Sequence, residues 1–243
     1  MGQNEKDAID PGAAARVIHG LETKLFEIGV RVEYGTDFAL LEHLLRKTSK
    51  EKLTEHFSTA LNTYTPANAY WLRAYSEDGE TVAVGAVRLD DLGTMSLGKY
   101  IANYWHRCYP DAAGDGARAS RHQPRFLSEV SGRVAYLGDL WVARLWQRKR
   151  IHEYLTPLAV VVTLQKWDPD WLYCWIRPGA WSKRYPMAYG FSAVHPVGIR
   201  WETPPVTIDP DLVMAVNKAS WARDWLDHLA EEFPLVSHSR PVE

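Results

Sequence analysis

The sequence has little that would indicate a membrane protein, a metal site or a disulfide framework. It contains only two cysteines, Cys108 and Cys174, and their separation matches neither a zinc-binding spacing nor a disulfide framework. No apolar run approaches the roughly 18 residues of a membrane-spanning helix. The polar, acidic N-terminus lacks the apolar segment of a secretory signal. We therefore expect a cytoplasmic protein with no membrane partner, no metal, and Cys174 as a buried, inert thiol.

Charge of one sign is also lacking, because the formal net charge is only −2. This balance gives no global argument for a nucleic-acid partner, so any basic function must be local. The 243 residues can bury a full core, and 46% of them are hydrophobic, as in ordinary soluble domains. What the chain does have is an excess of aromatic residues, with 11 Trp and 12 Tyr. Such rings suit a core and also a pocket for an apolar or cationic ligand.

Residues 134–155 combine a buried strand with a basic turn. Val134–Ala143 carries no charge except Asp139, which is typical of a strand covered on both faces. Four basic residues follow before the next apolar helical pattern begins: Arg144, Arg148, Lys149 and Arg150. The start of a helix presents free N–H groups and a partial positive charge. This segment therefore predicts a site for an anion, most naturally a phosphate.

The elements before this segment read as a strand, two helices and a hairpin. We expect a strand over Gly29–Tyr34, a helix capped by Thr36, and a second helix capped by Ser49 that carries Leu53, Phe57 and Leu61. Asp78-Gly79 is a strong hairpin signal. It joins predicted strands at Ala69–Tyr75 and Thr81–Arg88.

Residues 91–130 do not continue this succession of regular strands and helices. They contain a short aromatic helix pattern, Lys99–Cys108, and a long loop-like stretch, so they form either a functional lid or a surface insertion.

The second half of the chain alternates helices with short apolar strands. A helix continues to about Lys166 and contains Pro157, and a buried strand covers Trp171–Ile176. Further elements are expected as follows: a short helix at Ala180–Tyr189, strands at Phe191–Val194 and Ile199–Glu202, and a helical region at Asp209–Phe233. This order predicts an α/β fold with one mixed central sheet flanked by helices.

Three regions follow from this order. Residues 1–28 should form a tail and a short helix, residues 29–205 the main domain with its helical or loop insertion at 91–130, and residues 206–243 a helical extension. We expect that extension to pack on the core; a dimer interface is the alternative.

The order of elements resembles the GCN5-related N-acetyltransferase (GNAT) superfamily. Tyr136–Val142 looks like the family's fourth strand, Gln147–His152 stands where the family carries its acyl-CoA pyrophosphate loop, and Tyr189-Gly-Phe191 is similar to the Gly-Phe motif. The resemblance covers about residues 29–201. It implies that Leu140, Trp141 and Val142 hold the pantetheine arm of an acyl-CoA. The pyrophosphate would bind at residues 147–152: Gln147, Arg148, Lys149, Arg150, Ile151 and His152.

The loop departs from the family at two positions. Arg150 and His152 occupy places where the family has small residues, and only glycine allows unhindered approach of the backbone. Two readings follow: the side chains obstruct the phosphates, or Arg150 replaces backbone contacts with a charged fork. The donor is therefore an acyl-CoA such as acetyl-CoA, or an acyl carrier protein, or the site is degenerate and the protein a non-catalytic binding or regulatory protein.

The resemblance also does not decide which residues are catalytic. Many members place a general-acid tyrosine where this chain has Pro186, so Tyr185 and Tyr189 are the two candidates for protonating the leaving thiolate. Asp139 either binds the ammonium group and accepts its proton or is a structural carboxylate. Glu129 is a weaker candidate for water-mediated base chemistry.

The leading hypothesis is an acyl-CoA-dependent N-acyltransferase that acts on a primary amine of a small molecule by direct attack. Aromatic residues of the insertion, Tyr100, Tyr104 and Trp105, would cover the acceptor or a longer acyl chain. An acyl-carrier-protein-dependent N-acyl synthase is the second hypothesis, in which the basic turn meets an acidic carrier. No nucleic-acid partner is expected, and the protein is either a monomer or a homodimer.

Overall fold

The computed structural model describes residues 9–109 and 112–234, and in them a seven-stranded mixed sheet forms the centre. The strands stand in the order β1-β2-β3-β5-β6-β9-β7. Their bounds are β1 Val30–Gly35, β2 Ala69–Ser76, β3 Thr81–Asp91, β5 Arg133–Val142, β6 Trp171–Ile176, β9 Val213–Lys218 and β7 Ala193–His195. β5 and β6 pair in parallel, whereas the other neighbours are antiparallel. The predicted mixed-sheet α/β fold is confirmed.

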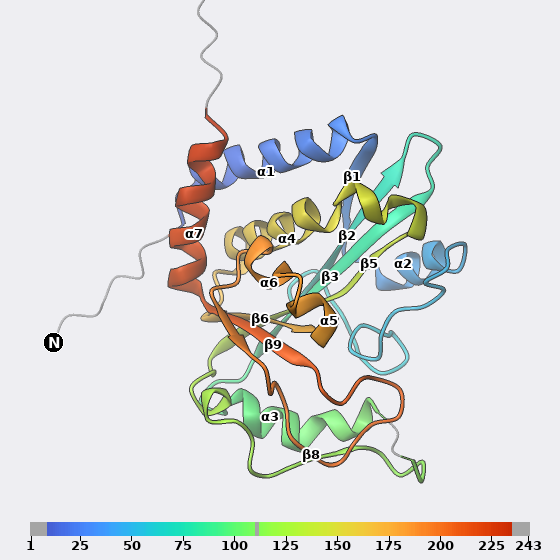
Figure 1. Cartoon of the computed structure of the whole chain (residues 1–243), viewed down its shortest axis with the longest axis vertical. Helices are drawn as coiled ribbons and strands as arrows, with labels where there is room; N and C mark the ends of the chain where they lie inside the picture. Colours follow the sequence, from blue (N-terminus) through green and yellow to red (C-terminus); the bar gives the residue numbers. More distant parts are fainter. Residues whose placement is uncertain (1–8, 110–111, 235–243) are drawn as a thin grey trace, which may run out of the picture.

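Helices cover both faces of this sheet (Figure 1). One face packs against α1 (Pro11–Glu27), α4 (His152–Trp167) and α7 (Ala219–Glu232), and we call it the α4 face. The other packs against α2 (Phe38–Leu45) and α3 (Leu97–Tyr104), and we call it the α3 face. Successive side chains of a strand point to opposite faces. In β5 and β6 this alternation sends Leu137 and Cys174 to the α4 face and Tyr136 and Tyr173 to the α3 face.

Several elements lie where the sequence predicts them. The hairpin of β2 and β3 turns at Gly79, whose φ is +80°, and Pro157 lies inside α4. The expected cap of α2 is displaced by one residue, because the side chain of Asp37 accepts the N–H of Leu40. Cys108 and Cys174 are both buried free thiols. Burial raises the pKa of the Cys174 thiol, as expected for an inert side chain.

The predicted helix after Ser49 is wrong, because residues 49–62 form a series of turns. Two features explain the difference. Glu51 has a φ of +59°, which a helix does not accommodate, and both the backbone N–H and the hydroxyl of Thr54 are bonded to Asp139. Leu53 and Phe57 are nevertheless buried, so their apolar spacing marks core positions without a helix.

The predicted helical region at 209–233 is wrong in its first part. Val213–Lys218 is strand β9, which lies between β6 and β7, and only Ala219–Glu232 is helical. An apolar run of a few residues fits a strand buried on both faces as well as a helix. The main domain therefore does not end at residue 205, because β9 completes the sheet. The first part of the expected N-terminal tail, residues 1–8, and the last residues, 235–243, lie outside the described residues.

The insertion, residues 91–130, packs on the α3 face of the sheet. It contains α3, the 3-10 turns η1 (Trp105–Arg107) and η2 (Arg125–Ser128), and β4 (Arg118–Ala119), which pairs with β8 (Trp201–Thr203). Leu97, Ile101, Trp105 and Leu127 are buried there. Within the described ranges, no helix combines the length and the apolar character needed to cross a bilayer.

Candidate active site

A β-bulge interrupts β5 in the middle of the sheet. Ala86 of β3 pairs with Gly138, but Val84 pairs with Trp141, so Gly85 stands opposite two residues, Asp139 and Leu140. Asp139 has a φ of +54°, a left-handed conformation that costs a non-glycine residue free energy. Bulges of this kind bend a strand and redirect its side chains. The bulge therefore turns the end of β5 away from its regular path.

Beyond the bulge, β5 and β6 separate. Their parallel register runs from Val134 opposite Trp171 to Leu137 opposite Cys174, although β5 continues to Val142. A cleft of about 730 Å³ lies at this separation. Its lining includes Leu155 and Cys174 from the α4 face and Tyr136 and Trp175 from the α3 face. The cleft thus reaches both faces of the sheet through the gap between the two strands.

The charged side chains that line the cleft are mostly cationic. Lys50, Arg177 and Lys183 line it, and Asp139 is the one carboxylate in the same lining. Sequence reasoning missed these three cations. Lys50 lies in a segment that the sequence predicts to be a helix. Arg177 and Lys183 follow β6, the strand next to β5, so their position after the end of that strand could have placed them at the cleft.

Asp139 is bound by groups from the turn segment 49–62. Its side chain is fully buried; it forms an ion pair with Lys50 and accepts hydrogen bonds from the N–H (3.1 and 3.2 Å) and the hydroxyl (2.9 Å) of Thr54. A buried carboxylate is tolerated only when it is paired and hydrogen-bonded in this way. These contacts make Asp139 a link between the bulge and residues 50–54.

The basic turn of the sequence is the 3-10 segment η3 (Arg144–Lys149), which leads into α4. Gln147 lines the cleft, and its side-chain amide donates to the carbonyl of Val142 at 3.3 Å. Lys149 lies over the ring of Trp146 and donates to the carbonyl of Ile28 at 3.1 Å. Arg148 is exposed. Leu140, Trp141, Val142 and His152 also line the cleft, whereas the lining does not include Arg148, Lys149, Arg150 or Ile151.

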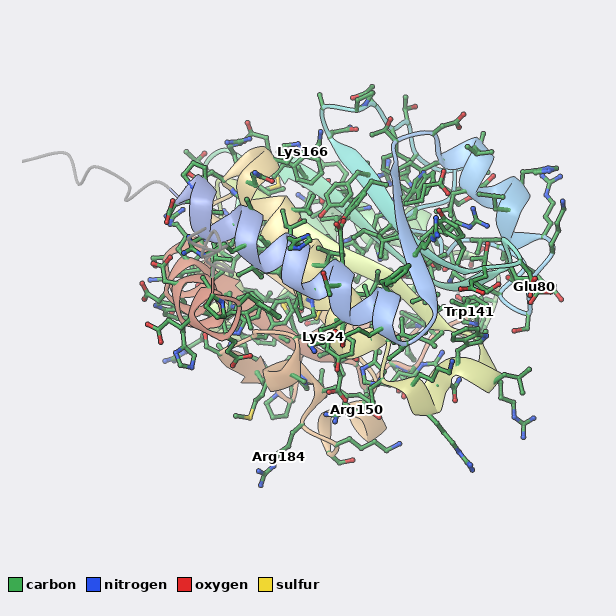
Figure 2. The ribbon with its side chains drawn as sticks, turned by 90° about the horizontal axis from the view of Figure 1, so that it is seen from above. Lys24, Glu80, Trp141, Arg150, Lys166 and Arg184 are labelled. Atoms are coloured by element: carbon green, nitrogen blue, oxygen red, sulfur yellow. The ribbon has the colours of Figure 1, made fainter. Side chains whose placement is uncertain are left out.

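Arg150 adopts the backbone conformation that glycine would take at this position. Its φ is +58°, in the left-handed region. Its guanidinium makes a two-point ion pair with Glu153, and the Arg150 side chain is 70% exposed. Arg150 and Arg184 lie on the same edge of the molecule in Figure 2. Ile151, in contrast, is fully buried, so its side chain belongs to the core and only its backbone can face a ligand.

His152 and two tyrosines form a cluster on the α4 side of the cleft. The hydroxyl of Tyr189 is 3.2 Å from Nδ1 of His152, and the ring of Tyr185 packs on the imidazole at 4.7 Å. Burial lowers the pKa of His152, which keeps the imidazole neutral at pH 7. Burial also raises the pKa of Tyr189, which keeps its hydroxyl protonated. A neutral imidazole next to a protonated phenol is suited to proton transfer.

Glu129 is not brought to this cleft. It follows η2 in the insertion, its side chain is exposed, and it is absent from the residues that line the cleft. Of the four residues predicted as catalytic, the structure therefore brings Asp139, Tyr185 and Tyr189 together. Among the described residues, no group of three or more His, Cys, Asp or Glu side chains is arranged to hold a metal ion.

No protein-family profile and no curated protein sequence matches the chain. Solved structures do match it. They include NAA60 from Arabidopsis thaliana in complex with acetyl-CoA (12% identity, TM-score 0.44, 77% of this chain and 98% of that one). An acetyltransferase of the GNAT family from Staphylococcus aureus Mu50 has 9% identity and a TM-score of 0.42 over 79% of this chain and 99% of that one.

A third match is AAC(6')-Ib in complex with paromomycin and acetyl-CoA, with 12% identity and a TM-score of 0.41 over 79% of this chain and 95% of that one. Because these identities are low, we derive the function from the chain's own residues.

Removing the charge of Asp139 should destabilise the protein. Asp139→Asn leaves the ammonium group of Lys50 without its carboxylate, and breaking a buried pair on one side typically costs about 3–5 kcal/mol. Chemical denaturation followed by tryptophan fluorescence would measure the free energy of unfolding. The matched control, Glu27→Gln, removes an exposed pair with Lys24 and should change it by less than about 1 kcal/mol. If both variants are equally stable, Asp139 does not anchor residues 50–54.

Proposed function

We propose that this chain is an acyl-CoA-dependent N-acyltransferase of the GNAT type, which transfers an acyl group, most simply acetyl, to a primary amine of a small molecule. The observation that carries the proposal is the cleft between the separated ends of β5 and β6, which joins the start of α4 to the α3 face. In this arrangement a thioester enters from one face of the sheet and an amine from the other. The two reactants meet where the strands part.

The acyl-CoA donor would occupy the α4 side of the cleft. Past Leu137 the described register of β5 with β6 ends, so the backbone of Leu140–Val142 is available on that side for the amide groups of a pantetheine arm. The pyrophosphate would lie at Gln147–His152. No side-chain hydrogen bond caps α4 at Ile151, so an anion can take the place of a cap at this helix start.

Arg150 gives this loop an unusual way to hold phosphate. The left-handed backbone keeps the shape that a glycine would allow, while the side chain adds a guanidinium next to the loop. A phosphate can replace Glu153 as the partner of Arg150, because both offer two oxygens to the fork. The intrinsic ion pair and the cofactor would then compete for the same cation.

The reaction itself is a direct displacement. The neutral amine attacks the thioester carbonyl, the carbon–sulfur bond breaks, and the thiolate of coenzyme A takes a proton from the hydroxyl of Tyr189. His152, hydrogen-bonded to Tyr189, returns a proton to that oxygen from the cleft. Asp139 is already held by Lys50 and Thr54, so we assign it to positioning the bulge and assign the proton of the amine to water in the cleft.

A carrier-protein donor is a second candidate, and one surface feature favours it. Leu145 is 92% exposed in η3, between the exposed cations Arg144 and Arg148. An apolar side chain flanked by cations suits an acidic protein partner. Transfer from acyl carrier protein that exceeds transfer from the matching acyl-CoA would support this donor.

Thermal denaturation with acetyl-CoA, a long-chain acyl-CoA and free coenzyme A tests the donor. A ligand at 100 times its Kd should stabilise the protein by roughly 2.7 kcal/mol. We expect Arg150→Glu to abolish this stabilisation. Arg150→Gly should weaken this stabilisation because the guanidinium is lost, although glycine adopts the left-handed backbone conformation without strain. Arg125→Glu, an equal charge change in η2 of the insertion and not in the loop at residues 147–152, should leave it intact. No stabilisation of the wild-type protein by any of the three compounds would overturn the proposal.

The roles of the two tyrosines can be separated by matched variants. Tyr189→Phe removes the hydroxyl that bonds His152, and we expect kcat to fall by about 10²-fold or more, the usual contribution of a general acid. Tyr185→Phe keeps the ring contact with His152 and should change kcat by less than about threefold. Steady-state release of coenzyme A, followed with a thiol reagent, provides the measurement. An equal loss in both variants would contradict the assignment to Tyr189.

A further inference from the structure

A closed ring of five aromatic side chains lies on the α3 face behind the cleft. We call His56, Trp105, Trp175, Tyr173 and Tyr136 the aromatic box. Consecutive ring centroids are separated by 4.4, 5.2, 6.5, 5.0 and 5.2 Å, the last distance joining Tyr136 back to His56. The five residues come from the turn segment, the insertion, β6 and β5, which are distant in sequence.

Four members of the aromatic box carry a buried polar atom without a hydrogen-bond partner. These atoms are His56 Nε2, Trp105 Nε1, Trp175 Nε1 and the hydroxyl oxygen of Tyr173. Buried polar groups in proteins are nearly always paired, because leaving one unpaired is costly. Five such atoms are found in the whole described chain, and four of them belong to this one ring of side chains.

The aromatic box is connected to the proposed reaction site. Tyr136 and Trp175 belong both to the box and to the cleft lining, so they form its rim. Trp105 comes from the insertion and closes the box from the α3 side. On the other side, the guanidinium of Arg88 lies 5.3 Å from the centre of the Tyr136 ring and is paired with Asp90.

The chemistry of the unpartnered atoms indicates what they would bind. The indole N–H groups of Trp105 and Trp175 can only donate, so their partner must offer an oxygen or another acceptor. Two carboxylates near the box and cleft, Asp90 and Asp139, are already paired with Arg88 and Lys50. With three cations and one carboxylate in its lining, the cleft favours a neutral or anionic ligand over a polycation.

We infer that the aromatic box recognises the acyl acceptor, and that this acceptor is an amine with a flat apolar body and a carboxylate or carbonyl oxygen, as in an aromatic amino acid. The inference rests on the proposed function. The ring of the acceptor packs on Tyr136 and Trp175, and its oxygen accepts the N–H of Trp175 as the edge of this indole, buried in the free protein, turns into the cleft. Its amine then faces the gap between β5 and β6, where the thioester carbonyl lies.

Three amines that resemble the proposed acceptor class to a decreasing degree test the inference. L-phenylalanine has the ring and the carboxylate, phenethylamine lacks the carboxylate, and spermine is a polycation without a ring. With acetyl-CoA present, kcat/KM for release of coenzyme A should be highest for L-phenylalanine and lowest for spermine. A preference for spermine over L-phenylalanine would overturn the inference.

Conservative variants then test whether Trp175 takes part in binding the acceptor. Trp175→Phe keeps the ring but removes the donor, and the KM for L-phenylalanine should rise about 10-fold while the KM for acetyl-CoA stays unchanged. Trp171→Phe, the same change on the same strand but outside the box, should alter neither value. The melting temperature of Trp175→Phe should be equal to that of the wild type or higher, because an unpaired buried donor has been removed. A lower melting temperature with an unchanged KM would show that the box holds only structural water.

Calorimetric binding of L-phenylalanine to the free protein separates this inference from the donor proposal. If acetyl-CoA does not bind but L-phenylalanine binds more weakly to Trp175→Phe than to Trp171→Phe, the proposed function fails and the box is still a binding site. If acetyl-CoA binds and L-phenylalanine binds wild type and Trp175→Phe equally or not at all, the box inference fails alone.

Discussion

The left-handed backbone of Asp139 is the constraint on which the site depends. It places two residues of β5 opposite Gly85, and past this bulge β5 no longer follows β6. The same residue holds Lys50 and Thr54, so the strain at the bulge is offset by an ion pair and hydrogen bonds from a segment far away in the sequence. One buried carboxylate thus fixes both the gap between the strands and the turn segment that borders it.

The two faces of the sheet are chemically different at this gap. The α4 face offers a helix start, the basic η3 segment and the Tyr189–His152 pair, all suited to a negatively charged thioester and its leaving group. The α3 face offers the aromatic box with its unpaired donors. A direct transfer needs two reactants held in one geometry rather than a covalent intermediate on the protein. In the proposed function, a sheet that opens between two parallel strands supplies that geometry without a nucleophilic side chain.

Much of the fold could be predicted because its signals are local. The hairpin at Asp78-Gly79, the strand at Trp171–Ile176 and the basic turn after Val142 all depend on neighbouring residues. The turn segment 49–62 could not be predicted, because its conformation depends on Asp139, 85 residues away from Thr54 in the sequence. Strand β9 was missed for a related reason: a short apolar run is decided by the partners between which it lies.

The candidate site shows the same division. Tyr185, Tyr189 and the residues along 140–152 were named from the sequence, but the pairing of Tyr189 with His152 required the structure. The aromatic box was visible in the sequence only as an excess of Trp and Tyr. Its members come from four segments, and nothing in their spacing indicates that they meet.

Hydrogen exchange of the full chain, with and without acetyl-CoA, tests the central claim most directly. If the thioester lies along the separated end of β5, backbone amides of residues 140–142 and 147–152 should exchange more slowly when acetyl-CoA is bound, while those of α2 should not change. Protection confined to other surfaces, such as the polar pocket lined by Arg88 and Arg107, would contradict the account.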